Sequence, residues 1–120
     1  MYKQERTITQ YRVIKMHQPE SCNPLSVPRG ERLSFERRKT EWPGWLWCKT
    51  QNGRSAWVPE PWVSIEGSAC VMERDYDSRE LSVKPDDVLT GILALCGWLL
   101  AENGDGRRGW VPLDNVLKNE

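Results

Sequence analysis

Short runs in which apolar and polar residues alternate recur along the chain, and this period of two predicts β-strands rather than helices. In the first half, Asn52-Gly53 is a strong signal for a two-residue hairpin, because both central positions of that turn favour positive φ. Pro59-Glu60-Pro61 interrupts any ladder and predicts a short helical turn. The strands predicted in this half lie at residues 11–16, 32–37, 45–50, 54–58 and 62–65.

The second half repeats the pattern of the first with the same internal spacing. Gly44-Trp45-Leu46 is followed by Trp57-Val58-Pro59, and Gly97-Trp98-Leu99 is followed at the same distance by Trp110-Val111-Pro112. The connection that leads to the glycine-tryptophan pair is shorter in the second copy, which predicts a surface loop in the first. The strands predicted in the second half lie at residues 70–74, 88–96, 98–101, 107–111 and 116–118.

An internal repeat of this length indicates two homologous small domains. The expected organisation is a flexible N-terminus at 1–10, a first domain at 11–65, a linker at 66–68 and a second domain at 69–118. Each domain has roughly 55–60 residues, near the lower limit for independent folding, so the two are expected to pack together and to unfold in one transition. Five short strands in each copy predict an all-β fold with two five-stranded barrels in tandem.

Composition and charge narrow the functional classes. The 120 residues include 17 basic and 17 acidic side chains, so the chain lacks the net positive charge that attracts nucleic acid or anionic lipid. No apolar run approaches the roughly 20 residues that span a bilayer, and the N-terminus shows no secretory signal. These features predict a cytoplasmic protein without membrane contact, for which nucleic acid is a disfavoured partner.

Residues suited to catalysis or metal binding are sparse. The four cysteines lack the Cys-x-x-Cys spacing of zinc sites, so reduced thiols and no metal are predicted. Cys48 corresponds to Ala101 in the second copy, which suits a small buried side chain. His17 is the only histidine, and no nucleophile or orienting group is identified for it, so neither enzymatic activity nor a cofactor is predicted.

The order of these marks resembles the Src homology 3 (SH3) family, in the variant form of bacterial tandem proteins. The marks are Pro24-Leu25-Ser26, Gly44-Trp45, Asn52-Gly53 and Trp57-Val58-Pro59 in the first copy, and Glu80-Leu81-Ser82, Gly97-Trp98, Asp105-Gly106 and Trp110-Val111-Pro112 in the second. The resemblance covers about residues 11–65 and 68–118. It implies two SH3-like barrels and a non-catalytic module that binds extended, proline-rich peptides, because a preordered polyproline helix loses little entropy on docking.

The resemblance also implies a ligand groove lined by tryptophan in each copy. The candidate ligand-binding residues are Trp42, Trp45, Trp57, Pro59 and Trp62 in the first copy and Glu80, Trp98, Trp110 and Pro112 in the second. Trp45 is expected to be the leading contact, since the first copy has more groove aromatics, and Glu80 is the acid that would meet a basic ligand residue. The competing interpretation is that tryptophans fill core or inter-domain space, foremost Trp47.

Departures from the family leave other ligands open. Both copies lack the tyrosines that the family places at the end of the first strand, and Asn115 stands where the closing tyrosine of the second copy is expected. Tyr76 supplies one groove position if its loop is shifted by three residues. A basic peptide or protein surface is therefore an alternative to a proline-rich one. Three further interpretations are a nucleic-acid-binding tandem barrel, a cell-wall-binding SH3 relative, and a second copy that only braces the first.

Overall fold

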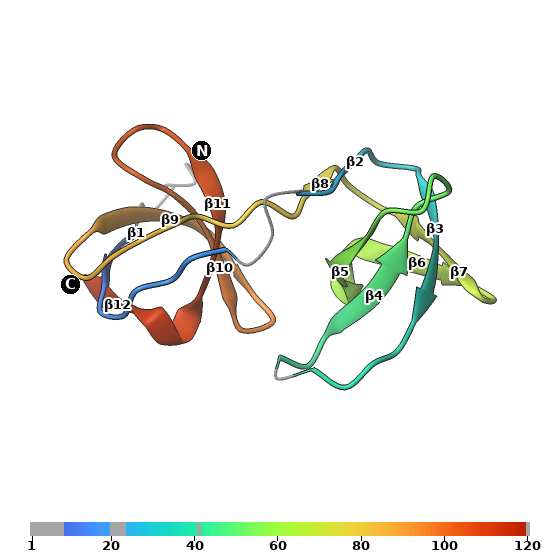
Figure 1. The fold of residues 1–120 in the computed structure, drawn as a ribbon, viewed down its shortest axis with the longest axis horizontal. Helices are drawn as coiled ribbons and strands as arrows, with labels where there is room; N and C mark the ends of the chain where they lie inside the picture. Colours follow the sequence, from blue (N-terminus) through green and yellow to red (C-terminus); the bar gives the residue numbers. More distant parts are fainter. Residues whose placement is uncertain (1–8, 20–23, 41, 120) are drawn as a thin grey trace, which may run out of the picture.

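A computed structural model describes residues 9–19, 24–40 and 42–119, and all of their regular structure is strand or 3₁₀ turn (Figure 1). The predicted all-β class is confirmed. The elements are β1 (Thr9–Val13), β2 (Ser26–Val27), β3 (Arg32–Glu36), β4 (Trp45–Lys49), β5 (Ser55–Pro59), η1 (Glu60–Trp62), β6 (Val63–Glu66), β7 (Ala69–Met72), β8 (Tyr76–Asp77), β9 (Val88–Leu95), β10 (Trp98–Glu102), β11 (Arg108–Pro112), η2 (Leu113–Asn115) and β12 (Val116–Asn119).

Two five-stranded sheets form two separate bodies. One has the order β5-β4-β3-β7-β6 and is called the first barrel; the other has the order β11-β10-β9-β1-β12 and is called the second barrel. In Figure 1, the yellow β7 lies among the green strands of the first barrel, and the blue β1 lies among the orange and red strands of the second. The barrels therefore exchange their first strands, since β1 belongs to the first sequence copy and β7 to the second.

The pairing of both exchanged strands is antiparallel and continuous. β1 lies between β9 and β12, with Tyr11 opposite Leu89 on one side and Lys118 on the other. β7 lies between β3 and β6, with Cys70 opposite Leu33 and Ile65. The sheets thus cut across the division into residues 11–65 and 69–118, which describes the repeat in the sequence but not the strands that each barrel contains.

The predicted linker at 66–68 has a different role. Glu66 pairs with Ala69, and Gly67-Ser68 is the tight turn between β6 and β7, with Gly67 at a φ of +65°. A two-residue turn brings the last strand of the first copy directly beside the first strand of the second, so the pairing of these two strands is local in the sequence. The segment predicted as a flexible N-terminus lies outside the described residues except for Thr9 and Gln10, which begin β1.

The long loops after the first strands are what connect the barrels. Residues 13–17 bond to residues 83–87 in the second barrel, where the His17 N–H donates to the Val83 carbonyl at 3.0 Å. Residues 25–31 accompany residues 72–78 in the first barrel, where β2 pairs with β8. The chain therefore crosses from the second barrel to the first after His17 and returns after Ser78.

The register of the exchanged strands differs by three residues from the alignment of the repeat. Val13 lies opposite Val116, and Met72 lies opposite the equivalent Val63, so Met72 matches Val13 rather than Met16. Burial explains the shift, because Val13 and Met72 are 0% and 1% exposed and fill the cores, whereas Met16 is 60% exposed. Side chains alternate across a strand, so the residue that faces the core sets the register.

The short helical turn predicted after Pro59 is confirmed, since η1 follows it. Asn52-Gly53 lies between β4 and β5 as expected, but the predicted two-residue hairpin is wrong: the ladder ends at Lys49 and Ser55, and of the two residues only Gly53 has a positive φ, at +87°. The loop predicted in the first copy runs from β3 to β4, whereas the tight turn Cys96-Gly97 joins β9 to β10. Cys48 is fully buried, as is Ala101 at the equivalent position.

Candidate functional site

A groove of about 860 Å³ lies where the two barrels meet, and we call it the junction groove. Six of the chain's seven tryptophans line it, together with Tyr76 and polar side chains from both sequence copies. These tryptophans are Trp42, Trp45, Trp47, Trp57, Trp98 and Trp110. The repeat predicts one groove in each copy, whereas the structure brings the equivalent tryptophans of both copies to one shared groove.

A continuous series of aromatic contacts crosses the junction. The Trp45 ring lies 6.4 Å from Trp98 and 5.9 Å from Trp110 between centroids, both at steep angles. Trp98 also lies 5.1 Å from Trp42, and Trp110 lies 5.7 Å from Trp62. The Trp62–Trp110 pair is tilted and the other three are edge-to-face, an arrangement that is attractive at these distances. The buried cluster of the first barrel thereby extends to partly buried apolar residues of the second, which are Leu93, Leu95, Cys96, Trp98 and Leu100.

The most buried of these tryptophans join the barrels to each other. Trp45, Trp62 and Trp110 are 9%, 7% and 3% exposed. The Trp45 indole N–H donates to the Cys96 carbonyl at 2.9 Å, and the Trp110 indole N–H donates to the Asp77 carbonyl at 3.0 Å. This placement differs from the expectation that Trp45 is the leading ligand contact, because its ring faces the opposite barrel.

The two candidate prolines are covered as well. Pro59 lies opposite Trp45 at the end of β5, and Pro112 lies opposite Trp98 at the end of β11. Both are buried, so they shape the 3₁₀ turns behind the groove and offer a ligand no side-chain surface. At these two positions, the copies therefore share a proline that shapes a 3₁₀ turn and not a ligand contact.

Four tryptophans keep partly exposed surface in the junction groove: Trp42, Trp47, Trp57 and Trp98. Trp47 and Trp57 form an edge-to-face pair at 5.2 Å on β4 and β5, with the Arg38 guanidinium 4.9 Å from the Trp47 ring. Trp42 packs over Gly97, where a Cβ atom would come within 2.5 Å of the indole. Trp47, predicted to be a packing residue, thus also contributes a wall of the groove.

The groove also contains an acid and an imidazole that are already paired. His17 Nε2 donates to Glu80 Oε1 at 2.7 Å, and the His17 ring lies 5.6 Å from Trp98. Glu80, predicted as the acid of the second copy, lies in the groove but has a partner within the chain. His17 carried no functional prediction, and only the three-residue shift in register would have placed it in the groove.

Tyr76 occupies the position that the shifted loop suggested, but it lies inside the junction. Its ring is 5% exposed and lies 5.9 Å from Trp62, and its hydroxyl donates to the Trp57 carbonyl at 2.8 Å. Burial raises the pKa of Tyr76 above its ordinary value, and the nearby charges of Glu80 and Asp77 add to this effect. Tyr76 therefore stays neutral and supports Trp57 from behind.

Three arginines that lie outside the lining of the groove have partners within the chain. Arg37 makes a two-pronged ion pair with Glu60 at 2.9 and 3.0 Å, and Arg38 pairs with Glu36. Arg74 stacks on Trp62 with its guanidinium carbon 4.0 Å from the ring centroid. The residues that line the junction groove include one arginine, the exposed Arg79, which does not amount to the basic stripe beside the aromatics that single-strand binding would need.

Two other features bear on the class of site. Within residues 9–19, 24–40 and 42–119, no group of three or more His, Cys, Asp or Glu side chains is arranged to hold a metal ion. In the same part of the chain, no helix has the length and apolar character to cross a membrane.

Comparison with known proteins identifies part of the chain. Residues 10–66 match the family model described as the variant SH3 domain, which agrees with the resemblance over residues 11–65. No curated protein and no solved structure shows significant similarity to the chain. The matched segment contains β1, which lies in the second barrel, and ends before β7, which completes the first.

Proposed function

We propose that this chain, whose residues 10–66 belong to the variant SH3 domain family, is a non-catalytic module that binds one peptide or protein segment in the junction groove. The observation that carries the proposal is the gathering of six tryptophans around one groove of about 860 Å³. SH3 domains bind protein or peptide partners, and tryptophan is enriched where binding energy concentrates.

The tryptophans divide into buried rings that hold the barrels together and partly exposed rings that line the groove, which supports a single composite site. Trp45 and Trp110 are buried and hydrogen-bonded across the junction, so they fix the relative position of the walls. Trp57 of the first barrel and Trp98 of the second remain partly exposed. A ligand that contacts both rings would be held by both barrels at once, which predicts one ligand per chain.

The chemistry of the groove favours an extended proline-rich or basic segment. Rigid aromatic walls suit proline rings, because a polyproline helix is ordered before it docks. Glu80 is partly exposed at 34% of its side chain and offers a carboxylate to a basic residue of the ligand. Binding of nucleic acid is the second candidate, and the presence of a single arginine, Arg79, among the residues that line the groove weighs against it.

The three free thiols at Cys48, Cys70 and Cys96 support a cytoplasmic location, where thiols remain reduced. This location is part of the same proposal, as is the second copy's membership of the SH3 family. The repeated motifs around Trp98 and Trp110 support that membership.

The test is a binding screen of the whole chain against proline-rich and basic peptides, with single-stranded DNA and peptidoglycan as competing ligands. Trp57→Ala and Trp98→Ala, from opposite barrels, are each expected to weaken the best peptide at least tenfold, since stacking on one ring contributes about 1–3 kcal/mol. Ile65→Ala, at an exposed position outside the groove, is the matched control.

Calorimetry should give one peptide per chain. Two equivalent sites, or an effect confined to one of the two tryptophans, would contradict the composite groove. Tighter binding to single-stranded DNA, with a steep loss of affinity as salt rises, would favour the nucleic-acid function instead. Specific sedimentation with peptidoglycan would favour the cell-wall function.

A further inference from the structure

Tyr11 of the exchanged strand β1 packs on a position of β9 that has no side chain. Tyr11 lies opposite Leu89, and Gly91 follows two residues further along β9. A Cβ atom at Gly91 would lie 2.5 Å from Tyr11 Cε1, so the ring occupies the space of a side chain at that position. The φ of Gly91 is outside the left-handed region, so the backbone does not require glycine there. Gly91 lies opposite the fully buried Ala101 on β10, and the large side chain of this layer therefore comes from the incoming strand.

The register locates the equivalent layer in the first barrel. Cys70 on β7 lies opposite Leu33, which is the equivalent of Leu89. Cys70 therefore matches Tyr11, which lies opposite Leu89. Phe35 lies two residues beyond Leu33 on β3 and takes the place of the glycine. Here the incoming strand supplies the small side chain, and the large ring belongs to β3.

The first barrel is closely packed around Cys70. Phe35 lies opposite Cys48 on β4 and packs against the buried core. Cys48 and Cys70 are fully buried, and their Sγ atoms are 3.9 Å apart. A thiol that is already in contact with its neighbour leaves no space for a phenol ring at position 70.

Keeping each first strand in its own copy would combine the wrong sizes. Tyr11 would enter the first barrel beside Phe35, in the space that a cysteine now fills. Cys70 would enter the second barrel beside Gly91 and Ala101, and the volume of the tyrosine ring would stay empty. Overpacked and underpacked cores are both destabilised, because close packing tolerates neither strain nor voids. The exchanged arrangement is the one in which both layers are filled.

We propose that Gly91 and Phe35 sort the two first strands by the size of one side chain. Gly91 admits Tyr11 to the second barrel, and Phe35 excludes it from the first. The two-residue turn after β6 acts in the same direction, because it places β7 beside β6. The segment 10–66 that matches the SH3 family then carries a first strand that does not fit its own core, so the whole chain is the smallest unit that folds.

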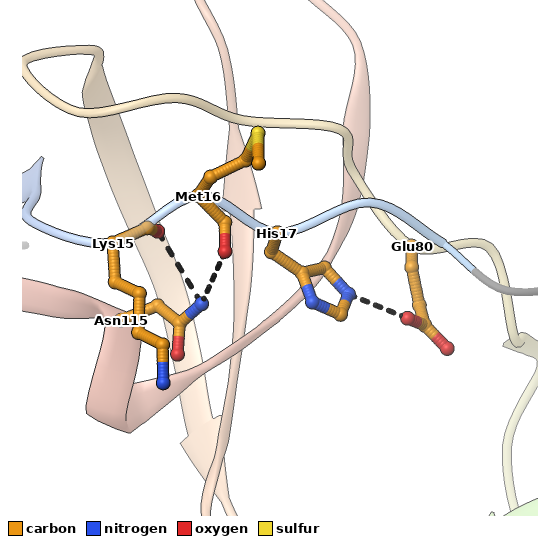
Figure 2. Close-up of polar contacts among 5 residues, drawn as sticks. All are labelled: Lys15, Met16, His17, Glu80 and Asn115. Atoms are coloured by element: carbon orange, nitrogen blue, oxygen red, sulfur yellow. Dashed lines mark hydrogen bonds and ion pairs between the residues drawn. The ribbon is translucent and has the colours of Figure 1, made fainter.

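The bonds of Asn115 to the segment after β1 do not distinguish the two strands (Figure 2). The Asn115 side-chain amide donates to the Lys15 carbonyl at 3.3 Å and to the Met16 carbonyl at 3.1 Å. Both acceptors belong to the main chain, so the equivalent segment of the second copy offers the same groups. Asn115 therefore supports either strand, and the discrimination lies in the packed layer.

A disulfide competition within one chain tests the proposal. Arg12 on β1 lies opposite Val88 on β9, and the Val13 N–H bonds to the Asp87 carbonyl at 2.8 Å. Arg12 and Val88 are therefore a non-hydrogen-bonded pair, in which side chains approach most closely. Arg32 on β3 is the equivalent of Val88 in the first barrel. All three side chains are exposed, so cysteines at these positions leave the packed layer unchanged.

The chain carries Arg12→Cys, Val88→Cys and Arg32→Cys together, with Cys22 and Cys96 replaced by serine. On mild oxidation by a soluble disulfide, the cysteine at 12 links to position 88 if the strands are exchanged and to position 32 if they are not. Peptide mass mapping of the monomer should show the 12–88 link in large excess. A dominant 12–32 link, or a 12–88 link found only between two chains, overturns the proposal.

Transposing the two sizes should reverse the preference. Gly91→Phe combined with Phe35→Gly keeps the composition of the chain, and it should raise the share of the 12–32 link at least tenfold. Val111→Ala truncates a fully buried side chain of the second barrel outside this layer, so it is the control for a general loss of stability and should leave the share unchanged. An unchanged share in the folded transposed chain refutes the sorting by size.

A second variant covers the case in which the transposed chain does not fold. Gly91→Phe alone should then lose its cooperative thermal transition, because the new ring meets Tyr11. Adding Tyr11→Ala removes the obstacle and should restore the transition. A Gly91→Phe chain that folds with an unchanged share of the two links, or that stays unfolded after loss of the Tyr11 ring, overturns the proposal.

Discussion

Replacing Trp45 by alanine should destabilise both barrels together. The ring is 9% exposed, contacts Trp98 and Trp110 of the opposite barrel, and donates a hydrogen bond to the Cys96 carbonyl. Truncating a buried tryptophan to alanine typically costs about 3–5 kcal/mol, and the lost hydrogen bond falls within that range. Since small proteins are stable by only about 5–15 kcal/mol, Trp45→Ala should remove a large part of the free energy of unfolding.

The measurement is chemical and thermal denaturation of the whole chain, followed by circular dichroism. We expect the midpoint temperature of Trp45→Ala to fall by roughly 10–25 °C, in one transition, because each barrel depends on a strand from the other sequence copy. Trp47→Ala is the matched control. Trp47 is partly exposed and pairs with Trp57 inside the same barrel, so the loss should be smaller.

Two results would refute this reasoning. A change of less than about 1 kcal/mol in Trp45→Ala would mean that its ring does not hold the junction. Two separated transitions in the unmodified chain would mean that the barrels unfold independently despite the exchange. A ligand-binding defect in Trp45→Ala is expected only in proportion to the loss of folded protein or to movement of the groove walls.

Three other changes test single features of the junction. Above pH 10, the free energy of unfolding should fall as the pH rises. Burial raises the pKa of Tyr76 in the folded chain, so Tyr76 ionises in the unfolded chain while it stays neutral in the folded one. The slope of the unfolding free energy against pH should therefore be smaller in Tyr76→Phe. Gly97→Ala should displace Trp42 and lower the free energy of unfolding by on the order of 1–3 kcal/mol, because Gly97 has a φ of +84° and a Cβ would meet the indole. Ligand affinity should fall as well, and an unchanged affinity would exclude Trp42 from the site. Arg37→Ala should leave the melting temperature at pH 7 unchanged, since the ion pair with Glu60 is exposed, and a clear drop would show that this loop stabilises the barrel.

The sequence predicts the local structure of this protein well because the signals for it are local. The hairpin at Asn52-Gly53 and the turn after Pro59 follow from the conformations that Gly and Pro permit. The repeated Gly-Trp and Trp-Val-Pro motifs locate β4 and β5, and again β10 and β11. The apolar alternation gives the buried positions of β7, where Cys70 and Met72 face the core, but it fails in β11, where Gly109, Trp110, Val111 and Pro112 are all buried.

The exchange of first strands depends on information that a repeat does not contain. The repeat shows that β1 and β7 are equivalent, but the apolar pattern that they share suits either barrel, and sequence similarity cannot say which barrel each one enters. The feature that lies outside the repeat is the two-residue turn at Gly67-Ser68, which places β7 beside β6 of the first barrel. Because this turn joins the two copies, a comparison of one copy with the other does not reveal its effect.

The same exchange explains why two expected grooves become one. Trp45 and Trp98 are equivalent residues, and the resemblance makes each the main surface of its own groove. In the structure they contact each other, so each barrel covers the surface that the other would have offered to a ligand. Trp98 keeps part of its surface exposed within this contact, as does Trp57 on the edge strand β5. The contact between one pair of equivalent tryptophans thus brings the rings of both copies to one groove, because it fixes the position of each barrel against the other.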